Sequence, residues 1–264
     1  MKRLNFFLTF FAITTLYSDI IIAQVQKPIT EVDKTCFEGL VVEKYYTPSS
    51  SDKLDTIGGA LASNVVTYRI FVDLKPGYSL QAVYGVTDHP LFIHTTTHFY
   101  NNVQYGQGSG DWVDDKKIVS GTAAFDSFLT MGAANKSYMA IPKEEDKDGS
   151  ALHIPSLNKA DGLMVGKIKP ITYFGVIPNF FNTYNSSETF STNNGSWAVF
   201  GGIQGATESN KIMIAQLTTD GDLSYEFNLQ IGTPTGGSVN FVASAPEGKE
   251  ILAGALTKPS AEKH

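Results

Sequence analysis

The chain has 264 residues, a formal net charge of −6 at pH 7, 42% hydrophobic residues and one cysteine. Because a net negative surface repels a phosphate backbone, we expect no nucleic-acid partner. A single cysteine excludes an intrachain disulfide, and a chain of this length can bury a full hydrophobic core without one.

The N-terminal residues have the composition of a secretory signal peptide. Lys2 and Arg3 precede an apolar stretch over residues 6–17, and Ala23 is the expected cleavage point. The apolar stretch is shorter than the roughly 20 residues that a membrane span needs, and no later segment reaches that length. We therefore expect residues 1–23 to be a cleaved signal peptide. The remainder, residues 24–264, is then a secreted domain, periplasmic or extracellular, with no membrane span.

Alternation of β-branched and aromatic residues with period two recurs along the rest of the chain. A tight hairpin is predicted at Asp220-Gly221, and no dozen residues carry a helical apolar stripe. The pattern favours an all-β fold, an antiparallel β-sandwich or jelly roll. The predicted strands are 65–74, 79–84, 91–100, 125–131, 197–200, 211–218 and 223–231, with weaker patterns over 239–243 and 251–256.

Two stretches interrupt the strand pattern, a polar one over residues 142–159 and an aromatic, Asn-rich one over residues 178–196. Neither is a low-complexity linker, so we expect a single β-sandwich domain over residues 24–264. The alternative is two packed halves, at about residues 36–142 and 160–256.

Aromatic rings interleaved with asparagines suggest a sugar-binding surface, because rings stack on sugar faces and amides bond to hydroxyls. The alternative is that the same rings fill an edge of the sandwich. The predicted ligand-binding residues are Trp112, Phe180, Phe181, Tyr184 and Trp197.

Alternating acids before a glycine suit the turn of a calcium-binding loop. Glu144, Asp146 and Asp148 precede Gly149 in this way, so they are candidate calcium ligands. A solvated acidic turn is the alternative, because the closing glutamate of an EF-hand loop is missing. We predict no other cofactor.

His94 and His98 are the second candidate for metal binding. On a strand they would stand roughly 13 Å apart, too far to share one zinc ion.

Several segments are similar to a β-rich module that recurs in exported proteins of Bacteroidota and other marine bacteria. The resemblance spans about residues 36–245 and implies export, but it carries no catalytic residue to this chain. The similar segments are TYRIFVD (67–73), GYSLQAVYG (77–85), FYNN (99–102), FDSFLT (125–130) and IAQLTTDG (214–221).

No recognisable catalytic motif is present, so three hypotheses follow. The first is a non-catalytic secreted module that binds an extracellular ligand or surface, with a glycan as the expected ligand class. The second is a secreted polysaccharide hydrolase or lyase. The third is a structural or adhesive matrix protein with calcium-stiffened loops.

Overall fold

A computed structural model describes residues 28–50, 52, 57–157, 159–182 and 188–259. The predicted signal peptide (1–23) and Tyr184 lie outside these residues. The described chain is mostly β-structure in several antiparallel sheets, which confirms the predicted all-β, sandwich-like fold. Its strands are β1 (Phe37–Tyr46), β2 (Val66–Leu74), β3 (Ser79–Gly85), β4 (Leu91–Thr95), β5 (Phe128–Leu129), β6 (Tyr138–Ala140), β7 (Leu163–Val165), β8 (Thr172–Phe174), β9 (Thr189–Thr192), β10 (Gly195–Ile203), β11 (Lys211–Thr219), β12 (Leu223–Glu226), β13 (Asn228–Gly232), β14 (Ser238–Val242), β15 (Ile251–Leu252) and β16 (Thr257–Lys258).

The helical elements within the described residues are short. One α-helix, α1, covers Asp115–Ile118, and no helix among the described residues is long and apolar enough to cross a membrane. The 3-10 helices are η1 (Asp33–Thr35), η3 (Gly110–Trp112), η4 (Ala123–Phe125), η5 (Lys143–Glu145), η6 (Pro155–Leu157), η7 (Pro178–Asn182) and η8 (Gly254–Leu256).

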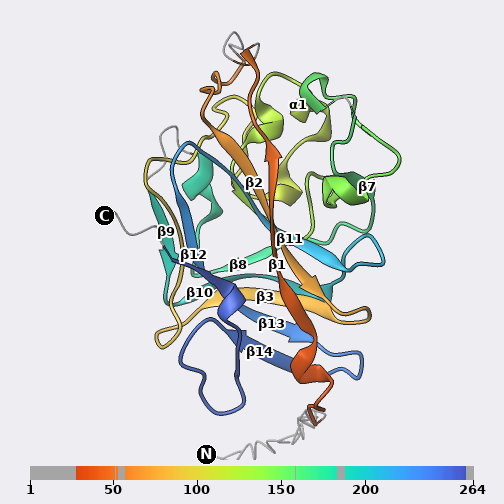
Figure 1. The fold of residues 1–264 in the computed structure, drawn as a ribbon, viewed down its shortest axis with the longest axis vertical. Helices are drawn as coiled ribbons and strands as arrows, with labels where there is room; N and C mark the ends of the chain where they lie inside the picture. Colours follow the sequence, from red (N-terminus) through yellow and green to blue (C-terminus); the bar gives the residue numbers. More distant parts are fainter. Residues whose placement is uncertain (1–27, 51, 53–56, 158, 183–187, 260–264) are drawn as a thin grey trace, which may run out of the picture.

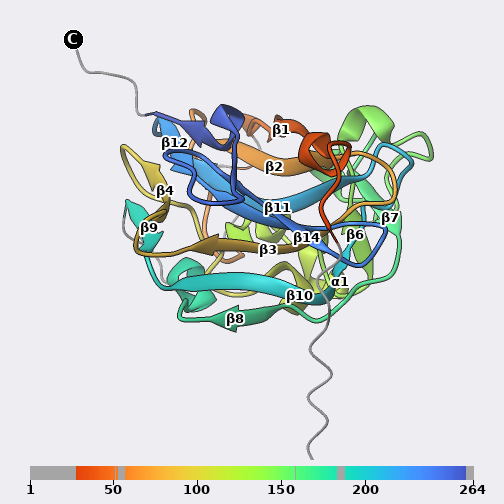
Figure 2. The ribbon, with the colours of Figure 1, turned by 90° about the horizontal axis from the view of Figure 1, so that it is seen from below.

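The described residues form three larger sheets and one two-stranded sheet (Figures 1 and 2). Sheet A has the strand order β1-β2-β11-β5, sheet B has the order β15-β14-β13-β3-β10-β8, and sheet C has the order β16-β12-β4-β9. Strands β6 and β7 form a separate two-stranded sheet. All pairs are antiparallel except β14 with β15. In Figure 1 the strands of sheet A cross in front of those of sheet B.

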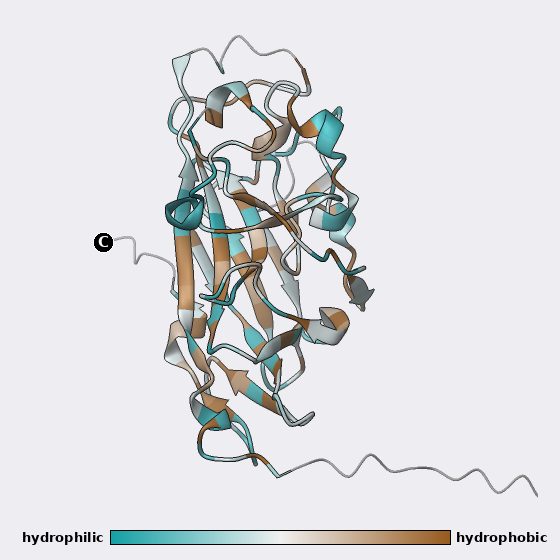
Figure 3. Ribbon diagram, turned by 90° about the vertical axis from the view of Figure 1, so that its right-hand side faces the viewer, coloured by the Kyte–Doolittle hydropathy of each residue, from teal (hydrophilic) through white to brown (hydrophobic). Residues whose placement is uncertain are grey.

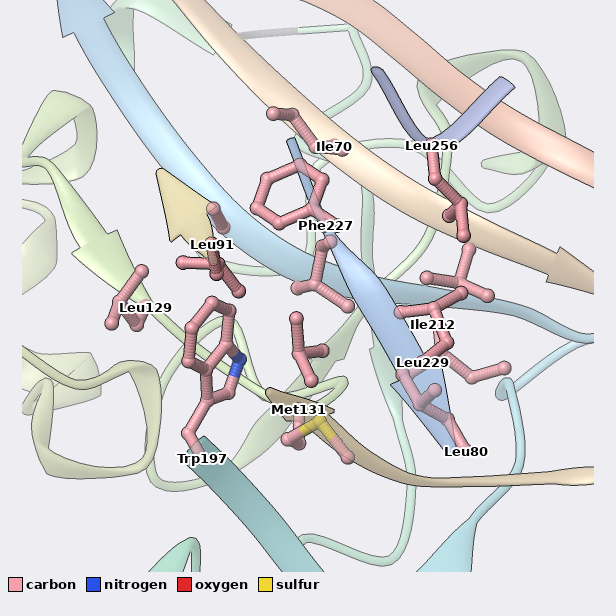
Figure 4. Packing of buried hydrophobic residues seen from close by; sticks show 14 of the residues in the cluster. Ile70, Leu80, Leu91, Leu129, Met131, Trp197, Ile212, Phe227, Leu229 and Leu256 are labelled. Atoms are coloured by element: carbon pink, nitrogen blue, oxygen red, sulfur yellow. The ribbon is translucent and has the colours of Figure 1, made fainter. Parts of the chain in front are cut away.

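The main core lies between sheets A and B (Figure 4). Ile70 and Ile212 of sheet A pack in the same buried cluster as Leu80, Leu229 and Trp197 of sheet B. All five side chains are completely buried. Because alternate residues of each sheet B strand enter this core, the residues between them face away from it.

A second cluster covers the opposite face of sheet A. Phe71 of β2 and Met213 of β11 pack there against residues of the long segment between β4 and β8, such as Phe125 and Leu157. With both faces covered, eight of the nine residues of β11 are buried. Figure 3 shows the hydrophobic positions concentrated in the central strands.

Several sequence-based strand predictions match the structure closely. Residues 65–74, 79–84 and 211–218 correspond to β2, β3 and β11, and residues 239–243 correspond to β14. The ten-residue strand β1 was not predicted.

The predicted hairpin at Asp220-Gly221 does not form, because β11 belongs to sheet A and β12 to sheet C. The turn bonds instead to threonines that follow β4: Thr97 Oγ1 donates to Asp220 Oδ1 at 2.6 Å, and Asp222 N donates to Thr96 Oγ1 at 2.9 Å. The chain therefore changes sheets at this turn.

Two predicted strands are shorter than expected. Residues 223–231 divide at Phe227, whose amide donates to Leu256 O, so β12 lies in sheet C and β13 in sheet B. Residues 91–100 form a strand only as far as Thr95, and Tyr100 N then donates to Thr218 O of sheet A.

The two sequence segments 36–142 and 160–256 share sheets. Strand β11 from the second segment lies between β2 and β5, and β3 from the first lies between β13 and β10.

Candidate functional site

The outer face of sheet B, opposite the core, contains three neighbouring depressions of about 870, 470 and 280 Å³. Gln230 of β13 lines all three, Asn240 lines the first two, and Ala82 lines the second and third. The depressions are therefore parts of one surface. We call this surface the sheet B groove; its residues are Gln81, Ala82, Tyr84, Phe174, Ser196, Ala198, Phe200, Gln230, Asn240 and Leu252.

Strand register sets the floor of the groove. Gln230 pairs with Asn240 on one side and with Ala82 on the other, and Ala82 pairs in turn with Ala198. These residues form a row across four strands, with two small side chains next to two amides. Because the two alanine side chains are single methyl groups, they leave space above the sheet, and a ligand could approach the backbone of β3 and β10.

Aromatic side chains stand on both sides of this row. Tyr84 lies two residues along β3 from Ala82, beside Ser196, and Ser196 pairs with Phe174 on β8. On the other side, Phe200 is two residues along β10 from Ala198 and is 79% exposed. Exposed apolar side chains that gather on one face are typical of binding surfaces.

A single break in strand register displays Phe200. The pairing of β10 with β3 jumps between Ala198 and Ile203, and this leaves extra residues on β10. Gly201 and Gly202 have φ angles of +71° and +66°, which favour glycine. A Cβ atom at Gly202 would stand 2.5 Å from Ser79 Oγ, so a larger residue there would clash with the Ser79 side chain.

Two polar atoms of the groove are shielded from solvent without a hydrogen bond to any described residue. They are the hydroxyl oxygen of Tyr84 and Oδ1 of Asn240, and both residues line the second depression. Polar atoms in such positions normally have a partner, because desolvation without a bond is costly. Burial, with a smaller contribution from the Glu250 charge, raises the pKa of Tyr84 to about 12, so the phenol stays protonated and can both donate and accept.

Charged residues occur at one end of the groove only. Lys34, Lys249 and Glu250 line the first depression, whereas the described residues of the other two depressions carry no charge. Glu250 Oε2 lies 2.8 Å from Nε2 of the buried His89 and also accepts from the backbone of Glu247. Lys34 is paired with Glu31 at 2.7 Å.

Four of the five aromatic residues predicted to bind a ligand lie elsewhere, and the fifth, Tyr184, is outside the described residues. Trp197 and Phe181 are fully buried, and the indole nitrogen of Trp197 donates to Thr130 O at 3.0 Å. Phe180 is half-buried and packs edge-on against Phe181 at 4.8 Å between ring centroids. These rings belong to the core, because the segment after β8 folds inward instead of projecting from the sheet.

Trp112 is 38% exposed and stacks edge-on against Tyr173 at 5.9 Å, outside the sheet B groove. Sequence periodicity did not separate buried from exposed aromatics at Trp112, Phe180 and Phe181, since these residues lie in short 3-10 helices outside the strand pattern.

The acidic segment 144–148 forms contacts within the protein. Asp146 accepts from the backbone amides of Gly149 and Gly162, and Glu145 pairs with Lys211 at 2.7 Å. No cluster of three or more His, Cys, Asp or Glu side chains placed to hold a metal ion occurs within the described part of the chain. Calcium binding by Glu144, Asp146 and Asp148 stays a prediction, which melting with calcium and then with chelator would test.

Sequence reasoning missed the groove itself. The signal available was the pair of segments 228–232 and 238–242, NLQIG and SVNFV, in which amides and serine alternate with apolar residues. Such a pattern places the polar residues on one face of a strand. It does not reveal that Gln230 and Asn240 lie beside β3 and β10.

Comparisons of the chain with protein-family profiles, curated proteins and solved structures found no match. The chemistry of the groove is therefore the basis for a functional proposal.

Proposed function

We propose that the protein is a secreted carbohydrate-binding module and that a linear glycan lies in the sheet B groove. The observation that carries this proposal is the convergence on one surface of the Gln230 and Asn240 amide side chains with the exposed rings of Phe174 and Phe200. Sugar hydroxyls both donate and accept, so they can bond to the oxygen and the nitrogen of an amide.

The shape of the groove supports a chain-like ligand. Strands in a sheet are about 4.8 Å apart, so the five spacings from β8 to β15 extend over about 24 Å. Phe174 and Phe200 offer exposed rings against which the apolar faces of sugar rings can stack. An extended oligosaccharide matches this combination of length, rings and neutral amides.

Binding without cleavage is better supported than hydrolysis or elimination. Glycosidases use two carboxyl groups across the scissile bond, and Glu250 is the single acid among the described residues that line the groove. Its carboxylate is already bonded to His89. The raised pKa of Tyr84 makes this phenol a poor general base for a lyase.

Export is part of the same proposal and rests on the sequence of the N-terminal residues. An exported protein would encounter polysaccharides in the periplasm or outside the cell, and there a glycan-binding face can function.

A glycan array of the mature chain, followed by calorimetric titration, tests the proposal. Gln230→Ala should weaken binding about tenfold or more, since each good polar contact contributes about 1 kcal/mol and Gln230 lines every part of the groove. Gln204→Ala is the matched control, because Gln204 is an exposed glutamine outside the groove. Equal loss in both variants, or no glycan bound by the folded protein, would refute the proposal.

A further inference from the structure

The distribution of charge along the sheet B groove is asymmetric, and this asymmetry bears on ligand selection. The second and third depressions are lined by uncharged described residues, whereas the first is lined by Lys34, Lys249 and Glu250. A ligand that fills the whole groove therefore meets neutral amides along most of its length and charges at the β15 end.

The three charges are not equivalent. Glu250 is bonded to His89, and Lys34 is paired with Glu31 on the same short turn. Lys249 is exposed and has no hydrogen bond or ion pair with any described residue. Its ammonium group is thus the charge at this end that has no partner among the described residues.

Lys249 lies in the exposed turn that precedes β15, at the edge of the groove. Strand β15 runs parallel to β14, with Ile251 beside Phe241, and Lys249 is two residues before Ile251. Asn240 and Lys249 line the same depression. A sugar bonded to the Asn240 amide would therefore have its substituents within reach of Lys249.

We propose that Lys249 is a specificity-determining residue that selects glycans with an anionic substituent, a carboxylate or a sulfate, at the β15 end of the groove. This inference rests on the proposed function. The net charge of the chain is −6, so its surface repels negative charge on other parts of a ligand. The favoured ligand therefore carries its negative charge only at the β15 end of the groove.

The experiment uses three oligosaccharides of one backbone: neutral, carrying a uronic acid, and carrying a sulfate ester. Their affinities for the mature wild-type chain, Lys249→Gln and the control Lys258→Gln are measured by titration at low and high salt. We expect the wild type to bind one or both anionic ligands ~2- to 5-fold more tightly than the neutral one, as for an exposed ion pair. Lys249→Gln should abolish this preference and leave neutral binding unchanged, and high salt should reduce the preference in the wild type.

The outcomes separate the two proposals. A preference for the carboxylated or for the sulfated ligand alone identifies the group that Lys249 recognises. Equal binding of all three ligands, or a preference that survives in Lys249→Gln, overturns the role of Lys249 and leaves glycan binding in place. Binding of none of the three, together with an empty glycan array, overturns the proposed function and this inference with it.

Discussion

The guanidinium carbon of Arg69 lies 3.4 Å from the centre of the Tyr45 ring, and both side chains are buried to 2% exposure or less. Arg69 also donates to Gln216 Oε1 and to the carbonyl oxygens of Asp161 and Gly162. One buried cation thus joins β1, β2, β11 and the loop before β7, and it anchors the layer that covers sheet A.

Replacing this cation should destabilise the fold. We expect Arg69→Met to lower the free energy of unfolding by about 2–4 kcal/mol, because Gln216 Oε1 loses its donor and the carbonyl oxygens of Asp161 and Gly162 each lose one of two donors. Urea denaturation measures the change, and Lys44→Met, at an exposed position of β1, is the control. A variant as stable as the control would show that the loop layer does not depend on Arg69.

Acid should weaken the hydrogen bonds that Asp33 accepts in the N-terminal turn. Asp33 accepts from the backbone and hydroxyl of Thr30 and from the hydroxyl of Tyr78, and these bonds, the Thr30 backbone bond foremost, lower its pKa below 3.8. A lowered folded-state pKa stabilises the fold above pH 3.8, and this stabilisation is lost as the pH falls through the folded-state value.

Asp33→Asn should therefore cost about 1–2 kcal/mol at pH 6 and progressively less below pH 4. Denaturation of both proteins at pH 6 and pH 3 measures this difference, with Asp148→Asn on an exposed loop as the control. A stability gap between wild type and Asp33→Asn that stays constant with pH would contradict the proposed linkage.

Two aromatic residues three positions apart on β10 should give opposite phenotypes. Trp197 is fully buried and Phe200 is 79% exposed. Trp197→Phe should lower the free energy of unfolding by roughly 1–3 kcal/mol through lost packing and the lost bond to Thr130, with glycan affinity retained. Phe200→Ala should weaken glycan binding with little change in stability. Thermal melting and ligand titration of both variants separate the effects. Lost binding in Trp197→Phe with unchanged binding in Phe200→Ala would show that the sheet B groove is not the binding face.

Filling the floor of the groove should block the ligand. Ala198 lies between Ala82 and Thr172 in the row across sheet B, so a leucine side chain there would stand where the ligand has to pass. We expect Ala198→Leu to abolish glycan binding while the melting temperature stays within a few degrees of the wild type. Ala255→Leu, at an exposed position of η8, should bind normally. Undiminished binding by Ala198→Leu would place the ligand elsewhere.

The sequence by itself determined the β-rich character of the protein and the positions of its long strands. Alternation in β2, β3 and β11 is a local property, since successive side chains of a strand point to opposite faces. The single cysteine and the acidic net charge are likewise independent of tertiary structure.

Which strands pair, and hence where the site lies, was decided by the tertiary structure. The Asp220-Gly221 turn has the residues of a hairpin, yet its bonds to Thr96 and Thr97 send the chain into another sheet. Gln230 and Ala82 are far apart in the sequence and become neighbours only through the β13–β3 pairing. Periodicity says that a residue faces outward, but long-range pairing determines which other outward residues share its face, and this is why the groove could not be read from the sequence.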